Sequence, residues 1–111
     1  MSIIDVFSTA SIKQDGMGVS DILLFNDCIG NVGISFFIES GSGPAKIEYT
    51  YDTTDIIETE DDAIINWFDW YPSEVSINTS RYDVCPRAMR INVPSSGTGT
   101  WRLCVKGMKG A

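Results

Sequence analysis

The sequence contains no histidine among its 111 residues. Histidine is the commonest general base near neutral pH and the commonest side-chain ligand of transition metals. Its absence excludes, within this chain, hydrolases whose serine or cysteine nucleophile depends on a histidine base. We therefore expect a protein that is not an enzyme and that holds neither a metal nor a cofactor.

Long apolar runs are also missing, since none approaches the ~18 residues that a membrane-spanning helix needs. The N-terminal stretch, MSIIDVFSTASIKQ, lacks the basic region and the long apolar region of a secretory signal. From these absences we expect a chain that does not enter a membrane and that stays in the cytosol where it is made.

Cysteine is scarce and widely spaced, with Cys28, Cys85 and Cys104 as the three in the chain. They are odd in number and form no C-x-x-C pair, so the pattern favours neither a disulfide framework nor a zinc site. We expect free thiols that are buried or half-buried.

Basic residues are few, and the net charge of −7 disfavours binding to nucleic acid. Residues 1–80 hold 14 acidic and two basic side chains, whereas residues 81–111 hold six basic and one acidic. Such polarity can place an acidic surface opposite a basic one, so that copies pack head to tail or dock on a larger assembly. The alternative is internal compensation, in which basic C-terminal strands pair beside acidic N-terminal ones.

Apolar residues make up 43% of the sequence, which indicates one folded domain with a core of its own. Period-two alternation is clearest over residues 86–107, and it predicts a half-buried β-hairpin around a loop of Ser, Gly and Thr. One face should anchor the core, with Met89, Ile91, Val93, Trp101, Leu103 and Val105. The other face should carry the densest basic surface, with Arg90, Arg102 and Lys106.

A second hairpin is predicted over residues 30–51, around a turn rich in Gly and Ser at 40–44. Turn signals recur about every 8–12 residues along the chain, as in small β-sandwiches. The sequence therefore predicts an all-β fold, an antiparallel β-sandwich of seven to eight short strands with a jelly-roll or Greek-key arrangement. We assign residues 21–111 to this sandwich and residues 1–20 to an N-terminal arm or first strand.

Four of the twelve aromatic residues, Trp67, Phe68, Trp70 and Tyr71, lie within five positions. One interpretation is a platform on which sugar rings stack while Asp69 binds their hydroxyls. The other, which we favour, divides the cluster between the core and an interface with a neighbouring subunit, since aromatic residues are enriched in interface cores.

Acidic residues crowd residues 52–62 but lack the spacing of a calcium-binding loop, so a solvated loop is the simpler interpretation. Carboxylates for glycoside hydrolysis could come from Asp52, Asp55, Glu58, Asp69 and Glu74. In so acidic a chain this set carries little weight. Arg81, Tyr82 and Arg87 could form an anion-binding patch, although solvated strand residues explain them as well.

The C-terminal third joins a proline-led strand, containing Pro86 and Arg90, to a Ser/Gly/Thr loop and a final Thr-Trp-x-Leu-x-Val-x-Gly strand over residues 100–107. Together with the Trp67-x-x-Trp70 run, this pattern resembles small β-sandwich structural proteins of tailed bacteriophages. Copies of such proteins decorate or cement the capsid, or form accessory parts of the head or tail. The resemblance spans roughly residues 62–107.

The resemblance implies a non-enzymatic virion structural protein, above all a capsid decoration or cement protein, assembled in the host cytoplasm. Its expected partners are copies of itself and other virion proteins such as the major capsid protein. The alternative is a carbohydrate-binding module or a receptor-binding tail accessory protein, with a glycan as ligand. From the residues themselves, the interface candidates are Arg90, Arg102, Lys106, Trp67, Trp70 and Tyr71.

Overall fold

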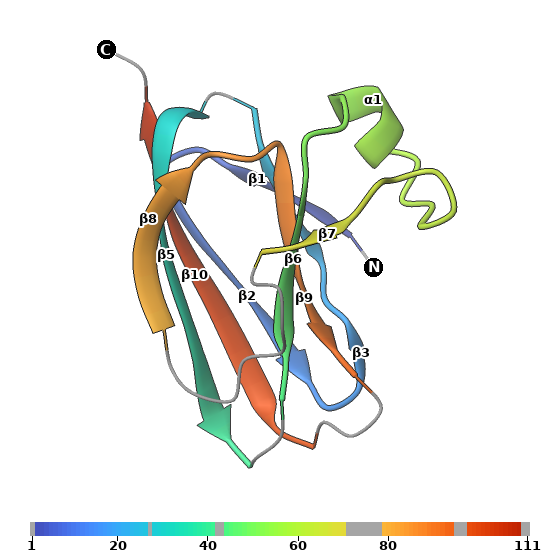
Figure 1. Cartoon of the computed structure of the whole chain (residues 1–111), viewed down its shortest axis with the longest axis vertical. Helices are drawn as coiled ribbons and strands as arrows, with labels where there is room; N and C mark the ends of the chain where they lie inside the picture. Colours follow the sequence, from blue (N-terminus) through green and yellow to red (C-terminus); the bar gives the residue numbers. More distant parts are fainter. Residues whose placement is uncertain (1, 27, 42–43, 71–78, 95–97, 110–111) are drawn as a thin grey trace.

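The computed structural model describes residues 2–26, 28–41, 44–70, 79–94 and 98–109, and they form a β-sandwich (Figure 1). Ten strands and one short helix lie in these ranges. In chain order they are β1 (Ile3–Val6), β2 (Thr9–Asp15), β3 (Gly18–Val19), β4 (Ile22–Phe25), β5 (Cys28–Ser40), β6 (Lys46–Thr50), α1 (Thr54–Ile57), β7 (Phe68–Asp69), β8 (Thr79–Val84), β9 (Ala88–Val93) and β10 (Thr100–Lys109).

Two sheets make up the sandwich. The first has the order β1-β4-β9-β6-β7, with β3 also paired to β9, and the second has the order β2-β10-β5-β8. All of these pairs are antiparallel except β1 with β4. The predicted all-β sandwich is therefore confirmed, with ten strands in place of seven to eight. Three of the ten, β1 to β3, come from residues 3–19.

Both predicted hairpins are wrong, because the strands of each lie in opposite sheets. β9 pairs with β4 and β6, whereas β10 pairs with β2 and β5. In the same way β5 belongs to the second sheet and β6 to the first. Period-two alternation marks the face of a strand that is buried, and strands of both sheets bury a face against the same core. Alternation thus predicts correctly which side chains are buried, but it does not predict which strands pair.

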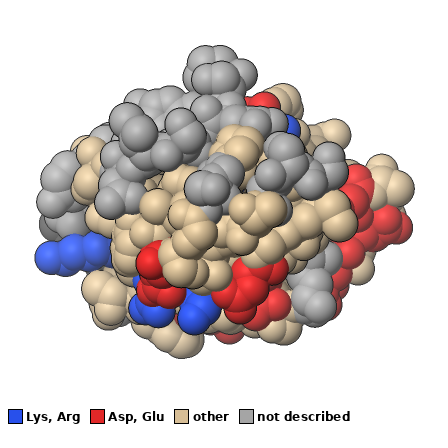
Figure 2. Space-filling model, turned by 90° about the horizontal axis from the view of Figure 1, so that it is seen from below, with Lys and Arg blue, Asp and Glu red and all other residues tan. Residues whose placement is uncertain are grey.

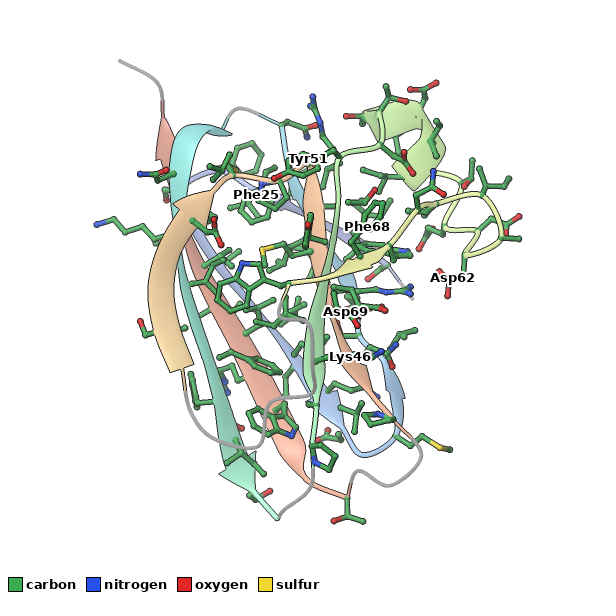
Figure 3. All side chains as sticks on the ribbon, in the orientation of Figure 1. Phe25, Lys46, Tyr51, Asp62, Phe68 and Asp69 are labelled. Atoms are coloured by element: carbon green, nitrogen blue, oxygen red, sulfur yellow. The ribbon has the colours of Figure 1, made fainter. Side chains whose placement is uncertain are left out.

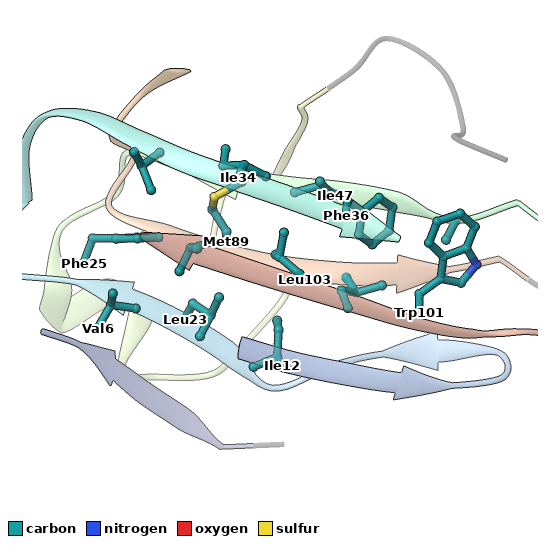
Figure 4. Packing of buried hydrophobic residues seen from close by; sticks show 14 of the residues in the cluster. Val6, Ile12, Leu23, Phe25, Ile34, Phe36, Ile47, Met89, Trp101 and Leu103 are labelled. Carbon is teal, nitrogen blue, oxygen red and sulfur yellow. The ribbon is translucent and has the colours of Figure 1, made fainter. Parts of the chain in front are cut away.

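The core lies between the sheets (Figure 4). All six residues that the sequence assigned to it from residues 86–107 are buried, and Trp101 stacks on Phe36 of β5 with ring centroids 4.6 Å apart. Burial of this apolar surface is the main force that holds the sheets together. The other members of the buried cluster are Val6, Ile12, Leu23, Phe25, Val32, Ile34, Ala45 and Ile47.

A segment between β6 and β7, residues 51–67, covers part of the outer face of the first sheet (Figure 1). Its helix α1 places Ile57 against Ile22 and Leu24 of β4, in a second buried cluster. This explains why every residue of β4 is buried. Leu23 and Phe25 face the core, whereas Ile22 and Leu24 lie under the segment. We call residues 51–67 the covering segment.

The apolar pattern of residues 63–70, AIINWFDW, predicts a strand, and in the structure this strand is limited to Phe68–Asp69. The pattern of residues 74–78 also predicts a short strand, which lies outside the described residues. In the described ranges no helix is long and apolar enough to cross a membrane.

Candidate functional site

Arg90 is the most heavily engaged of the predicted interface residues. It lies on the outer face of β9 and is only 4% exposed, because the covering segment lies over it. Its Nε donates to Glu48 Oε1 at 2.8 Å, and its Nη1 donates to Asp62 Oδ1 at 2.7 Å. The prediction that Arg90 belongs to an exposed basic surface is therefore wrong, since the residue is a buried ion-pair hub.

Trp67 completes this cluster from the covering segment. The Arg90 guanidinium carbon lies 4.3 Å from the centre of the Trp67 ring, a cation–π arrangement. The ring also packs on the cluster formed by Ile22, Leu24 and Ile57. Trp67 is thus half-buried in the fold, where it fastens the covering segment to the first sheet.

The acidic side chains of the covering segment are spread along it. Asp52 accepts a hydrogen bond from the backbone N–H of Asn66 at 2.7 Å, and Asp62 binds Arg90. The hydroxyl of Thr53 and backbone N–H groups at the start of α1 hold the pKa of Asp55 below its usual range. Across the described ranges no group of three or more Cys, Asp or Glu residues is placed to hold a metal ion. Glu74 lies outside those ranges.

The outer face of the second sheet is different, since no described segment packs over its middle. The strand register sets Ser11, Cys104, Ser35 and Ser80 in one row across the four strands. These side chains are small, and they leave a hollow of about 520 Å³ in the sheet surface. We call it the outer hollow. It is lined by Thr9, Ala10, Ser11, Gly33, Ile34, Ser35, Ser80, Cys104, Val105 and Lys106.

Two predicted interface residues lie on this face. Lys106 is exposed at the rim of the outer hollow. Arg102 lies four positions away on β10, and its Nε forms an ion pair with Glu39 Oε1 at 2.6 Å. Lys13 pairs with the same carboxylate at 3.6 Å. The structure thus keeps Lys106 and Arg102 on one face and separates them from Arg90, which lies on the other sheet.

The cysteines differ from the prediction of free thiols. Cys104 is free and half-buried in the outer hollow. Cys85, however, is disulfide-bonded, and the one further cysteine in the sequence is Cys28. The prediction that no disulfide forms is therefore wrong. Spacing could not reveal the bond, because a disulfide depends on which strands lie side by side.

A third surface lies at the open side of the sandwich, where β7 ends one sheet and β8 ends the other. Tyr49 lies at its centre, with the Tyr51 ring edge-on at 5.5 Å and the Phe68 ring tilted at 6.0 Å. Tyr51 is 60% exposed and Phe68 is 55% exposed. Figure 3 labels both side chains, near the upper ends of β6 and β7. We call Tyr49, Tyr51 and Phe68 the aromatic patch.

Trp70 closes the inner side of this patch. It packs against the core, and its indole N–H donates to Asp83 Oδ2 of β8 at 2.9 Å. Beside it is a cleft of about 90 Å³, lined by Tyr49, Tyr51, Trp70, Asp83, Val84 and Pro86. Burial raises the pKa of the Tyr51 phenol, and Tyr49 and Asp83 raise it further.

The predicted aromatic cluster is therefore divided three ways. Trp67 belongs to the covering segment and packs on the first sheet, Trp70 bonds to β8 at the open side of the sandwich, and Phe68 faces solvent. Tyr71 lies outside the described residues, as do the side chains of Arg81 and Tyr82. The sequence pattern does not identify Tyr51 as a surface residue. Its position just after β6, two residues beyond Tyr49, is the signal that its side chain lies past the edge of the core.

The chain matches no protein-family model and no curated protein. Two solved structures are similar in backbone. One is the pre-peptidase C-terminal domain of a collagenase from Bacillus anthracis, with 18% identity, 94% of each chain covered and a TM-score of 0.48. The other belongs to Bacillus endospore appendages, described as disulfide-linked pili, with 11% identity, 92% of this chain and 86% of that chain covered, and a TM-score of 0.46.

Proposed function

We propose that the chain is a non-enzymatic structural protein that docks in many copies on a larger particle, as a capsid decoration or cement protein of a tailed bacteriophage does. The observation that carries the proposal is the contrast between the two outer sheet faces. The covering segment packs on the first sheet, whereas the middle of the second sheet is open and hollowed. An open sheet face with a hollow is a surface into which side chains of a partner can pack.

The outer hollow has the surface chemistry of a docking face. Its row of small side chains lets a partner approach the sheet closely, and its serine hydroxyls can donate or accept hydrogen bonds. Phe37, half-buried on the same face, pairs with Arg102 across β5 and β10. The serine hydroxyls, Phe37 and Arg102 give this face a mainly polar surface with little apolar area. Such a surface suits contacts that are individually weak and act in large numbers.

The distribution of charge supports docking by this face. Lys106 lines the outer hollow, and no acidic side chain is among the residues that line it. In the view from below, one group of acidic side chains lies on the right, the side on which Figure 1 shows α1, and others lie lower in the view beside basic side chains (Figure 2). Residues 51–69 contain seven acidic residues and no basic one. We infer that the outer hollow docks on an acidic surface, either on a second virion protein or on another copy of this chain.

The described carboxylates support a structural role as well. Glu48 and Asp62 bind Arg90, Asp69 pairs with Lys46 at 3.5 Å (Figure 3), and Asp52 ties the two ends of the covering segment. These four carboxylates are thus occupied in holding the fold. We place the protein in the virion, assembled in the host cytoplasm, with the Cys85 disulfide forming once the particle leaves that reducing compartment.

The test is co-sedimentation of the purified chain with heads of the phage that encodes it, at low and high salt. We expect saturable binding that weakens as salt rises, because the contact pairs Lys106 with acidic groups. Ser35→Trp, which fills the outer hollow, and Lys106→Glu should each abolish binding. Ser8→Trp, at an exposed position outside the hollow, is the control and should bind like the native chain.

Two results would contradict the proposal. One is native protein that stays in the supernatant at every salt concentration and protein concentration. The other is Ser35→Trp and Lys106→Glu variants that bind as the native chain does. Melting temperatures of all variants are measured first, so that loss of binding is separated from loss of folding.

A further inference from the structure

The edge of β2 that faces away from β10 is a second surface, and we propose that it pairs with the same edge of another copy of this chain. β2 ends the second sheet, and among the described residues it pairs with β10 alone. Two copies would join by antiparallel pairing of their β2 strands about a twofold axis. This contact does not rest on the docking function, because it forms in solution without the particle.

The hydrogen-bond pattern identifies the groups that this edge carries. The Gly16 backbone N–H donates to the Gly99 oxygen at 2.9 Å. These two residues come next in the β2–β10 register, which is continuous up to Asp15 and Thr100. Bonded pairs alternate with non-bonded pairs along an antiparallel ladder, so the even-numbered residues of β2 bond to β10. The odd-numbered residues point their backbone N–H and C=O groups outward, and we call this row the free edge: Thr9, Ser11, Lys13 and Asp15.

The charged side chains of β2 turn away from the free edge. Lys13 pairs with Glu39 of β5 at 3.6 Å, so its ammonium group reaches across β10. Asp15 accepts a hydrogen bond at 2.8 Å from the hydroxyl of Thr100, which also lies on β10. Edge strands are commonly guarded by outward charges, proline, a bulge or short length. β2 has seven residues, no proline and an unshifted register, so its free edge is open to another strand.

The sequence of β2 suits a second copy as that strand. In an antiparallel pair centred on Ile12, Thr9 lies opposite Asp15 of the other copy, and Ser11 lies opposite its Lys13. All the outward groups of the two free edges then meet, and no two like charges lie opposite each other. Ile12 points from β2 into the core (Figure 4), so two apolar side chains meet at the twofold axis.

The balance of charge also favours this edge as a contact between copies. The chain as a whole carries a net charge of −7, so two copies repel each other. β2 contains one lysine and one aspartate, and its own net charge is zero. Two copies can therefore meet along β2 without bringing more acidic residues together.

The pairing would set two outer hollows on one continuous sheet. β2 contributes Thr9, Ala10 and Ser11 to the lining of the outer hollow, so the two hollows would lie on either side of the twofold axis. A dimer of this kind would engage the particle through two contacts at once, which strengthens overall binding without any new type of contact.

The first test is sedimentation velocity of the purified chain across protein concentrations, at low and high salt. We expect a monomer–dimer equilibrium that high salt strengthens, because salt screens the repulsion between two acidic chains. Docking through Lys106 should instead weaken as salt rises. The two proposals therefore fail separately.

Proline at position 13 tests the free edge directly. Lys13→Pro removes an outward N–H from each copy and should raise the dissociation constant of the dimer about tenfold or more. Lys13→Ala is the matched control, because both variants lose the pair with Glu39 and only proline loses the N–H. We expect Lys13→Ala to dimerise like the native chain. Melting temperatures establish that each variant is folded.

Backbone amide exchange of the native chain, measured by NMR, tests the same edge without a substitution. In dilute protein the amides of Ser11 and Lys13 should exchange fast, whereas those of Ile12 and Gln14, which bond to β10, should exchange slowly. In concentrated protein Ser11 and Lys13 should become protected as the dimer forms. This measurement decides the matter if Lys13→Pro does not fold.

The proposal is overturned if the native chain stays monomeric at every concentration and salt. It is also overturned if a dimer forms in which Lys13→Pro and Lys13→Ala associate equally, or in which the Ser11 and Lys13 amides remain unprotected. Protection of these amides only on phage heads, with a free chain that is monomeric, would assign the free edge to another virion protein instead.

Discussion

Single residues decide how the covering segment is held. Arg90 bonds to Glu48 beside it on β6 and to Asp62 in the covering segment, and its guanidinium lies against the ring of Trp67. The buried charge of Arg90 is compensated by the two carboxylates and the ring, and the buried charge of Glu48 is compensated by Arg90. The pair adds little net stability compared with apolar residues of the same size, but either partner alone is costly.

Arg90→Ala should lower the free energy of unfolding by about 3 kcal/mol, because Glu48 is left charged and buried without a partner. Urea denaturation measures the change. Lys46→Met is the matched control, since its pair with Asp69 is more exposed and should contribute less than about 1 kcal/mol. The double variant Arg90→Met with Glu48→Leu should recover most of the loss. Equal effects of Arg90→Ala and Lys46→Met would refute this account.

Gly41 is required for two reasons, and comparison with Gly16 separates their effects on stability. Both have a positive φ, +73° at Gly41 and +66° at Gly16, which costs about 1 kcal/mol or more for alanine. A Cβ at Gly41 would also lie 2.9 Å from the Gly99 Cα, whereas at Gly16 it would meet nothing within 4 Å. Calorimetric melting should therefore show Gly41→Ala less stable than Gly16→Ala. The opposite order would mean that the backbone contact relaxes freely.

At the scale of elements, the covering segment is the feature that the sequence predicted least well. Its acids suggested a solvated loop, and they are in fact mostly exposed. However, Ile57 and Trp67 turn inward and make the loop part of the core structure. Two apolar residues ten positions apart carry no periodic signal, so their burial depends on the groove between strands that only the assembled sheet provides.

Ile57→Ala should cost about 3 kcal/mol of unfolding free energy, because the side chain is fully buried over Ile22 and Leu24. Ile64, in the same segment, is 50% exposed, so Ile64→Ala should change stability by less than about 0.5 kcal/mol. Chemical denaturation of the two variants beside the native chain provides the comparison. A covering segment that is merely a solvated loop would give two small and similar values.

Strand faces were predictable from alternation, but strand partners were not. The residues chosen for the core from residues 86–107 are all buried, yet β9 and β10 face each other across the core instead of pairing edge to edge. Pairing depends on contacts between residues far apart in sequence, such as Thr9 with Lys106. The same reason explains why Arg90 and Arg102, alike in pattern, lie on opposite outer faces.

At the scale of the whole molecule, the Cys85 disulfide ties the fold together. We expect one of the three cysteines, Cys104, to react with a thiol reagent after denaturation without reductant. Reductant should lower the stability of the native chain by about 2–4 kcal/mol, because a disulfide restricts the unfolded state. Cys85→Ser should be destabilised and insensitive to reductant, and Cys104→Ser should behave as native. Three reactive thiols would disprove the bond.

The place of β10 has a consequence for synthesis. This strand, residues 100–109, lies between β2 and β5. It therefore joins the two strands of the second sheet that come first in the chain. A chain still emerging from the ribosome therefore cannot close that sheet, and the facing edges of β2 and β5 stay without their neighbour until the last strand arrives. Such late, long-range pairing makes folding slow and leaves nascent chains open to aggregation. The yield of folded protein would thus depend on how fast the ten residues of β10 fill the gap between β2 and β5.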